Sequence, residues 1–365
     1  MNLDKFRNVV NVAVSTNPFY KEWIKDTENV PIIDRTTFLK NNQKILNNYE
    51  ITSRTSGSTG VPVCISQSEE RVAMETRYFK LYQAMLKHKH KDAVILYTGH
   101  SNNSKYFDIN HSIEEQIDFI EFKRRHGARS IITYPTNSEQ ICKEYQLRNI
   151  DTKSILSFGL IGESIEEYQT QLISKTFQNA KIWSTYSSME FGLIAVMCPH
   201  NSNYFHIFDD KLGVEVLRED GTECEDGEMG RVVITDYYNF QSPLIRYEIG
   251  DYATKGKCTC NLKYPSFSSI YGKIRGALLH RNGNRITFTD LSVSIRDIEG
   301  IEQYQVIQED VENFTMKIVC DKNIDKEIET AFQNHFGYLP TLKIENVDKI
   351  EKCSNGKYYS SICKV

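Results

Sequence analysis

The chain contains 365 residues, a quarter of them charged, and carries a formal net charge of −4. So small a charge argues against a protein that binds nucleic acid or membrane surfaces, because both attract a basic excess. No apolar run approaches the length of a membrane span, and Met1–Arg7 lacks the apolar core of a signal peptide, so we expect a cytoplasmic protein. Nine cysteines without a disulfide-type spacing are then expected to be buried thiols or metal ligands.

Predicted helices and strands alternate along the first half of the chain. Residues 1–50 have apolar positions at helical spacing, interrupted at Pro18 and Pro31. The following segments are predicted as strands at 93–97, 130–134, 155–160 and 181–185, and as helices at 67–88, 138–147 and 166–177. This order predicts a layered α/β domain with a mainly parallel sheet, whose ligands bind at the carboxyl ends of the strands.

The pattern changes after Leu212. Segments 213–217 and 230–235 alternate like strands, with glycines in the turn region between them, and predict a small antiparallel β subdomain. Strands at 304–308, 314–319 and 341–347, with a helix at 326–336, predict a small α+β domain. We therefore expect an N-terminal domain over 1–271, a hinge at 272–276 and a mobile C-terminal domain over 277–365. A simple tight turn would explain the two glycines of the hinge equally well.

A hydroxyl-rich loop follows Arg54, with the sequence Thr55-Ser56-Gly57-Ser58-Thr59-Gly60. Glycine allows the backbone N–H groups to approach an anion, and the hydroxyls add donors for phosphate oxygens. The loop lacks the Gly-Lys-Ser/Thr ending of the common phosphate-binding loop. A plain surface turn is the alternative interpretation.

Three further segments carry side chains suited to a nucleotide. Tyr186 can stack on a base, and Glu190, four residues later, can hold a divalent cation. Asp251 follows a glycine at the end of an apolar run and can accept both ribose hydroxyls. Lys357 lies in a glycine-containing loop and can offset phosphate charge. Each segment taken alone also has a purely structural explanation. The Tyr186–Glu190 segment can be a strand-to-loop turn, Asp251 part of a common Gly-Asp turn, and Lys357 a solvated surface lysine.

Together these segments resemble the adenylate-forming superfamily of acyl- and aryl-coenzyme A ligases. The resemblance runs from about Asn17 to the C-terminus. The segments occur in the family's order, as Thr55-Ser-Gly-Ser-Thr-Gly-Val-Pro62, Gly162-Glu163, Tyr186-Ser-Ser-Met-Glu190, Tyr247-Glu-Ile-Gly-Asp251, Gly272-Lys273 and Gly356-Lys357. Pro243-Leu-Ile-Arg-Tyr247 and the short C-terminal domain resemble the phenylacetate–coenzyme A ligase branch and its capsular-polysaccharide relatives.

This resemblance implies an ATP-dependent activation of a carboxylic acid, with Mg²⁺, release of pyrophosphate and transfer of the acyl group. The acceptor would be a thiol of coenzyme A or a carrier protein, or an amine. The loop residues Thr55, Ser56, Ser58 and Thr59 would bind the β- and γ-phosphates, and Lys357 would bridge the carboxylate and the α-phosphate. Glu190 would hold Mg²⁺, and Asp251 the ribose. The remaining ATP-binding positions would be Gly57, Gly60, Gly162, Glu163, Tyr186, Ser187 and Lys273.

The chain also departs from the family pattern. Lys273 stands where the family usually has arginine, and Arg275 stands near a position that is commonly acidic. Lysine lacks the planar fork that arginine offers to two acceptors. These departures motivate an alternative, a catalytically weak, zinc-braced protein that binds a nucleotide or a partner.

Four residues predict a zinc site: Cys198, His206, Cys258 and Cys260. Three thiolates and one imidazole complete a closed tetrahedral shell, and soft thiolates in a reducing compartment favour zinc. Some members of the related branch carry a metal at such positions. His200 and Cys224 compete for these roles, and four unrelated buried residues are the alternative.

The carboxylic acid is not specified by the sequence. The expected ends of strands offer Tyr134, Trp183 and Ser184 as pocket walls, although aromatic residues there are as often core. His100 and the polar residues 102–104 can supply further contacts. Cys363 is expected only to end a strand.

Overall fold

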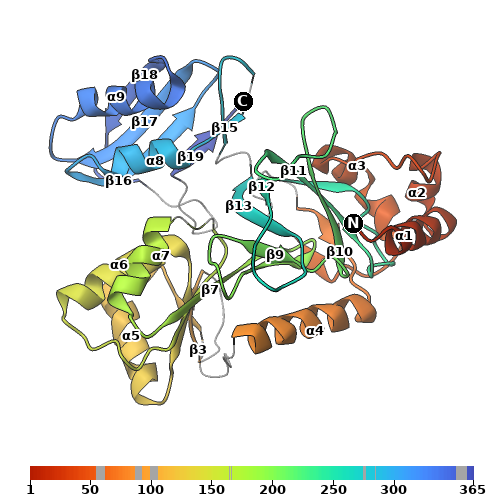
Figure 1. Ribbon diagram of the computed structural model, residues 1–365, viewed down its shortest axis with the longest axis horizontal. Coiled ribbons are helices and arrows are strands. Elements are labelled where there is room, and N and C mark those ends of the chain that lie inside the picture. Colours follow the sequence, from red (N-terminus) through yellow and green to blue (C-terminus); the bar gives the residue numbers. More distant parts are fainter. Residues whose placement is uncertain are drawn as a thin grey trace. The chain divides into compact units, whose positions relative to one another are not determined.

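The computed structural model describes residues 1–54, 62–86, 93–98, 106–163, 165, 167–273, 277–283, 285–350 and 360–365. They form two compact units, Met1–Ile270 and Tyr271–Val365 (Figure 1). The first unit is built on a large sheet with helices, and the second has its own four-stranded sheet. The predicted fold class, a layered α/β domain followed by a separate C-terminal α+β unit, is confirmed.

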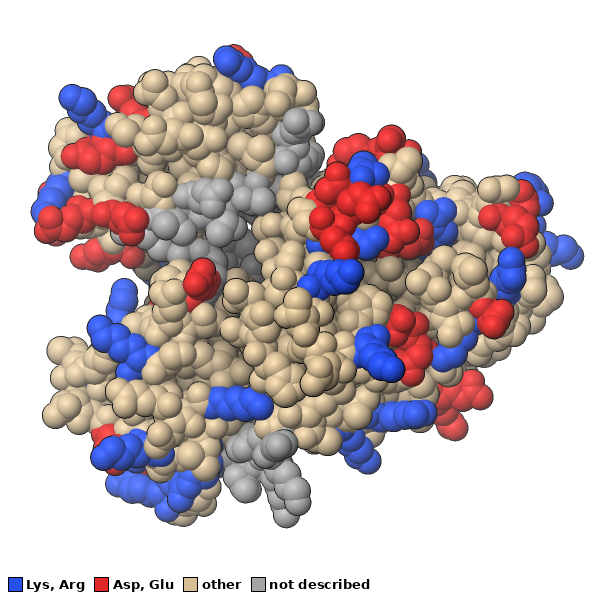
Figure 2. All heavy atoms as spheres, in the orientation of Figure 1, with Lys and Arg blue, Asp and Glu red and all other residues tan. Residues whose placement is uncertain are grey.

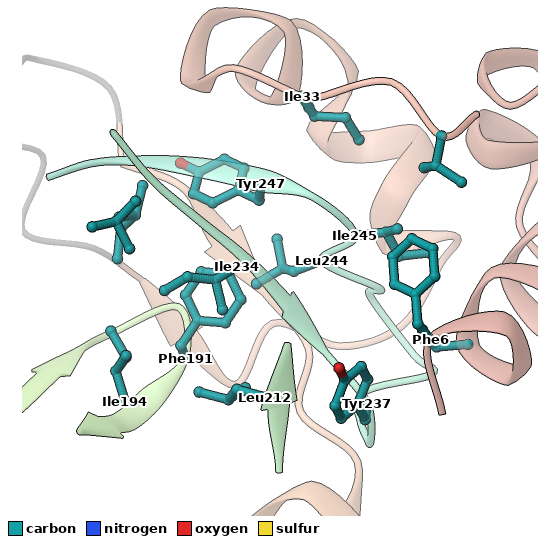
Figure 3. Packing of buried hydrophobic residues seen from close by; sticks show 14 of the residues in the cluster. Phe6, Ile33, Phe191, Ile194, Leu212, Ile234, Tyr237, Leu244, Ile245 and Tyr247 are labelled. Atoms are coloured by element: carbon teal, nitrogen blue, oxygen red, sulfur yellow. The ribbon is translucent and has the colours of Figure 1, made fainter. Parts of the chain in front are cut away.

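Three helices begin the chain: α1 (Leu3–Thr16), α2 (Pro18–Trp23) and α3 (Arg35–Leu46). Each has a side-chain cap, and Pro18 takes the first position of α2, where no N–H is needed. Phe6, Phe38 and other apolar side chains of these helices pack onto the β subdomain in a shared core (Figure 3). The N-terminal helices are therefore part of the first unit.

The large sheet has eleven strands in the order β10-β11-β12-β13-β9-β8-β7-β6-β5-β3-β4. Five neighbouring strands are parallel, namely β3 (Ala93–Tyr97), β4 (Tyr106–Asp108), β5 (Ser130–Thr133), β6 (Ser157–Leu160) and β7 (Lys181–Ser188). From β7 onward antiparallel pairs join the remaining strands, which are β8 (Gly192–Met197), β9 (Phe205–Ile207), β10 (Leu212–Leu217), β11 (Met229–Asp236), β12 (Tyr247–Gly256) and β13 (Ser266–Lys273). The sheet thus joins a parallel half to the antiparallel subdomain.

Helices cover the parallel half in layers. One apolar cluster joins the strands to α5 (Ile113–Arg125), α6 (Pro135–Leu147) and α7 (Glu167–Thr176). A separate cluster joins the strands to α4 (Glu69–Leu86) through Tyr78, Tyr82 and Trp183. Pro135 begins α6, because a proline at the first helical position has no N–H to leave unpaired. The short strands β1 (Ser53–Arg54) and β2 (Cys64–Ile65) pair antiparallel, and Ile65 packs in the core that the N-terminal helices share with the β subdomain.

The second unit has a four-stranded sheet in the order β18-β17-β16-β19. Its elements are β14 (Ala277–Leu279), β15 (Arg285–Thr287), α8 (Thr289–Arg296), β16 (Ile301–Gln308), β17 (Asn313–Cys320), α9 (Asp325–Phe336), β18 (Thr341–Asn346) and β19 (Ser361–Cys363). Phe314, Phe332 and Phe336 centre its core. Cys363 ends β19, and its thiol contacts the Gln308 side chain.

The surface is mixed in charge, with Lys and Arg interspersed among Asp and Glu on the face that Figure 2 shows. Among the described residues, no helix combines the length and the apolar character that crossing a membrane would require.

Candidate active site and metal centre

Two residues expected at the adenosine site meet in the first unit. Tyr186 lies in β7 and Asp251 in β12, and the tyrosine hydroxyl donates a hydrogen bond of 2.5 Å to Oδ2 of Asp251. Burial, with the Asp251 charge added, raises the pKa of Tyr186 well above its ordinary value. The hydroxyl therefore stays protonated near neutral pH, and it can hold the carboxylate in place as a donor.

Glu190 lies in the turn between β7 and β8 and is 7% exposed. Its Oε1 atom lies 3.8 Å from Nη1 of Arg35, the first residue of α3. Burial raises the pKa of Tyr247, and the nearby Glu190 carboxylate adds to this effect. The Glu190 charge also adds to the raised pKa of Tyr186, the residue that holds Asp251.

Arg35 is a member of this group that sequence reasoning missed. A cation in the first turn of a helix lies at the positive end of the helix dipole, which is unfavourable unless an acid balances it. Asp34 caps α3, and Arg35 follows directly. A basic residue straight after a helix cap was therefore the available signal, although it did not identify Glu190 as the partner.

Gly162 and Glu163, two of the expected ATP-binding residues, lie just beyond β6. Gly162 has a positive φ of 78°, which suits a glycine at a sharp turn. Glu163 accepts hydrogen bonds from the Thr136 N–H at 3.1 Å and from the Thr136 hydroxyl at 2.8 Å. Since Tyr134 at the cap position of α6 makes no side-chain cap, the Glu163 carboxylate caps this helix. Ser187 is exposed in β7.

The expected pocket walls lie in two different surroundings. Tyr134 is buried at the end of β5, where its hydroxyl lies 2.8 Å from that of Thr98 and its ring stacks on Tyr97. Trp183 is buried within the layer under α4, and its indole N–H donates to the Ser157 hydroxyl at 2.9 Å. Ser184 is buried too, and donates to the Leu160 carbonyl. In the described structure, Trp183 and Ser184 therefore have core partners.

Several predicted site residues lie outside the described residues. They are Thr55, Ser56, Gly57, Ser58, Thr59 and Gly60 of the hydroxyl loop, His100, residues 102–104, Arg275 and Lys357. The side chain of Lys273 is likewise not described. Their roles remain predictions.

The four predicted metal ligands come together from three segments of the chain. One ligand atom from each of Cys198, His206, Cys258 and Cys260 lies within 4.8 Å of all the others. Sγ of Cys258 is 3.9 Å from Sγ of Cys198, and Sγ of Cys260 is 3.2 Å from Nε2 of His206. A tetrahedral zinc ion with Zn–S bonds of about 2.3 Å places two sulfurs about 3.8 Å apart, so this cluster fits the ion.

Neighbouring groups orient the cluster for a metal. Nδ1 of His206 lies 3.2 Å from the Tyr264 carbonyl oxygen, which leaves Nε2 facing the thiols. Burial lowers the pKa of His206, so the ring is in the neutral form that coordinates metals. Backbone N–H groups of His200 and Leu262 donate to the sulfurs of Cys198 and Cys260. The competing candidates His200 and Cys224 are not members of the cluster.

Comparison with known proteins gives the fold a family context. The curated Protein CapK of Staphylococcus aureus is 24% identical over 97% of this chain and 86% of its own length. A solved structure of 2-hydroxyisobutyryl-CoA ligase in the postadenylation state has a TM-score of 0.77 at 13% identity, covering 99% of this chain and 88% of that one. The fold is that of the adenylate-forming ligases.

Two further findings agree with this fold. Residues 278–364 match the family model of the CapK C-terminal domain. The amide bond synthetase McbA from Marinactinospora thermotolerans has a TM-score of 0.62 at 12% identity, over 83% of this chain and 66% of that protein. The predicted resemblance to the adenylate-forming superfamily and its CapK-like branch is thus confirmed.

Proposed function

We propose that this protein is an ATP-dependent ligase that activates a carboxylic acid as an acyl-adenylate and passes the acyl group to a thiol or an amine. The observation that carries the proposal is the hydrogen bond between Tyr186 and Asp251. These residues are 65 positions apart, and each was expected at the adenosine site for a separate chemical reason. Their contact within a ligase fold supports a shared nucleotide site.

Asp251 accepts the ribose hydroxyls in this proposal, and the Tyr186 ring lies against the base. The hydrogen bond from Tyr186 fixes one carboxylate oxygen, so the other is oriented toward the sugar. Glu163 contributes through the cap it makes on α6, which steadies the loop after β6. These roles require no proton transfer from the protein.

Glu190 and Arg35 serve the phosphate side of the proposed site. The acid and the base lie 3.8 Å apart and are both largely buried, so each offsets part of the charge of the other. When bound, Mg²⁺ supplies neutralisation of phosphate charge, and Glu190 would be its protein ligand. The hydroxyls of Thr55, Ser56, Ser58 and Thr59 would hold the β- and γ-phosphates, and Lys357 the α-phosphate.

The first step forms a bond between a carboxylate oxygen of the acid and the α-phosphorus. The bond from that phosphorus to the bridging oxygen breaks, and pyrophosphate leaves with the electron pair. In the second step a thiol or amine attacks the acyl carbon, AMP leaves, and the proton of the nucleophile passes to solvent. Positioning and charge neutralisation carry most of such catalysis.

We also propose that the Cys198–His206–Cys258–Cys260 cluster holds a structural Zn²⁺. Four protein ligands leave no open coordination position, so the ion would have no direct chemical role. It would tie the end of β8 to β9 and to the segment after β12. This brace would support the elements that carry Glu190 and Asp251.

Pyrophosphate release with a panel of carboxylic acids tests the ligase function. At least one acid should give ATP-dependent turnover that Lys357→Ala lowers by a hundredfold or more. Lys343→Ala is the matched control, because Lys343 is an exposed lysine in the same unit. The panel is then repeated with coenzyme A, a phosphopantetheinylated carrier protein and simple amines, and the acceptor that accelerates AMP release is identified. ATP binding without turnover for any acid would instead favour the catalytically weak nucleotide-binding protein.

A further inference from the structure

Four charged side chains lie close to the turn that joins β7 to β8 and contact one another. Arg71 and Glu75 come from α4, Asp236 ends β11, and Lys211 precedes β10. Lys211 and Asp236 are completely buried, and Arg71 is 1% exposed. Arg71 pairs with Asp236 at 2.5 Å and with Glu75 at 3.0 Å, while Lys211 pairs with Glu75 at 2.5 Å. Two bases and two acids therefore form a connected, neutral network.

The network binds the backbone of the turn directly. Nζ of Lys211 donates to the carbonyl oxygens of Phe191 at 3.2 Å and of Leu193 at 2.5 Å. The guanidinium of Arg71 also donates to the Phe191 carbonyl. Oε1 of Glu75 accepts from the Leu193 N–H at 2.7 Å. Charged side chains thus hold backbone groups on both sides of residue 192.

Gly192 is fitted to this arrangement. Its φ of 58° lies in the left-handed region, which favours glycine. A Cβ atom at this position would lie 2.6 Å from Oε2 of Glu75. The carboxylate therefore approaches the backbone more closely than any residue with a side chain would allow.

Stability alone is a weak reason for such a network. Burying ions costs solvation free energy, and apolar residues of similar volume often stabilise a core as well or better. What a charged network adds is a fixed geometry at the groups that it binds. Here those groups belong to the turn that carries Glu190, two residues before Gly192.

We propose that Arg71, Glu75, Lys211 and Asp236 are positioning residues that fix the Glu190 carboxylate for a divalent cation bound with the nucleotide. This inference rests on the proposed function, because that function gives Glu190 its ligand. The network acts only through the backbone of the turn. A misplacement of about 1 Å at a catalytic group lowers a rate by about a hundredfold, so a rigid turn is a functional requirement.

The test compares Glu75→Gln with Glu121→Gln. Glu121 is also partly buried and paired with an arginine, Arg124, but it belongs to α5 in the other helix layer. Mn²⁺ affinity is measured by electron paramagnetic resonance with a non-hydrolysable ATP analogue present. Hydrogen exchange of the peptide spanning 188–193 is measured without ligand. The double variant Glu75→Gln/Lys211→Met removes one acid and one base, so it keeps the network neutral if the single variant fails to fold.

We expect Glu75→Gln and the double variant to weaken Mn²⁺ binding tenfold or more and to accelerate exchange in 188–193, while Glu121→Gln changes the affinity less than twofold. A purely structural network would lower the melting temperature without changing the affinity of the folded protein. Affinity in the folded variants equal to that of Glu121→Gln would overturn the inference and leave the proposed function standing. Wild-type protein that binds no Mn²⁺–nucleotide complex would overturn both.

Discussion

Removal of the zinc ion that we propose for the cysteine–histidine cluster is expected to destabilise the unit Met1–Ile270. The cluster joins three chain segments, since Cys198 follows β8, His206 lies in β9, and Cys258 and Cys260 follow β12. A ligand present at 100 to 1,000 times its dissociation constant stabilises the folded state by about 2.7–4.1 kcal/mol. For a unit of this size each kcal/mol corresponds to about 2–4 °C, so chelation should lower the melting temperature by about 10 °C.

The assay combines thermal unfolding, with and without a strong chelator, and elemental analysis of freshly purified protein. Wild-type protein should contain about one equivalent of zinc. Cys260→Ser should lose the metal and the chelator effect together. Cys224→Ser is the matched control, because Cys224 is a buried thiol of the same unit outside the cluster. Its response to chelator should equal that of the wild type, whatever its own stability.

Two results would refute this reasoning. A zinc content below about half an equivalent, in protein never exposed to chelator, would show that the cluster does not hold the ion. An equal chelator-induced shift in Cys260→Ser and the wild type would show that the metal binds elsewhere.

Three further predictions concern the nucleotide site and its supports. Tyr186→Phe should weaken ATP binding by about ten- to a hundredfold in calorimetry, because a hydrogen bond to a charged group contributes about 1.5–3 kcal/mol; unchanged affinity would mean that the contact with Asp251 does not orient the carboxylate. Burial lowers the pKa of Lys211 from 10.5 to about 8, so the unfolded chain binds more protons between these values. The free energy of unfolding of the wild type, relative to that of Lys211→Met, should therefore rise from pH 8 to 10.5 in urea titrations. A fall over this range would contradict the lowered pKa of Lys211. Chelation of the zinc should change Mn²⁺–nucleotide affinity less than twofold, whereas a loss as large as that of Glu75→Gln would mean that the metal positions Glu190 itself.

The fold was predictable because local patterns agreed with the tertiary structure. The segment 93–97 was expected as a strand, and β3 spans Ala93–Tyr97. Helix 326–336 was expected one residue inside the bounds of α9. These elements have strong apolar periodicity, which tertiary packing reinforces. The strands β9, β12 and β13 were not predicted, since their apolar pattern is short or shared with loops and their pairing is set by distant partners.

The grouping of the three cysteines and the histidine was predictable for a different reason. Few residue types bind soft metals, so the choice among cysteines and histidines in a short stretch is narrow. The sequence predicted His206 as the ligand but left His200 as a competitor, because both lie near Cys198 in the chain. Strand pairing selects His206 as the histidine of the cluster. Because β8 and β9 are antiparallel neighbours with Val196 opposite His206, the His206 imidazole lies near the thiols.

The charged network had no comparable signal. Arg71 and Asp236 are 165 residues apart, and neither belongs to a recognisable motif. From sequence, the side chain of an arginine on a helix is usually expected to be exposed to solvent. Only the packing of α4 against the sheet shows that Arg71 is buried. Trp183 illustrates the opposite case, because a large aromatic residue near a strand end suggested a pocket wall, whereas its ring packs against Gly159 inside the core. Whether a single side chain is buried depends on which face of its helix or strand packs against the core. The amino-acid composition does not show which face that is.

The strand β8 connects the two supports of the proposed site. Its residues Leu193 to Met197 are buried, so apolar packing holds the middle of the strand. The ends of a strand lack such packing and open most readily. At one end Cys198 enters the metal cluster, and at the other the charged network holds the backbone around Gly192. Glu190 lies two residues before the second end, and among the described residues this is the end where charged side chains bind the backbone directly. The division is physically reasonable, because a metal can brace a strand from a distance, whereas a carboxylate that must meet a cation needs its own turn held in place.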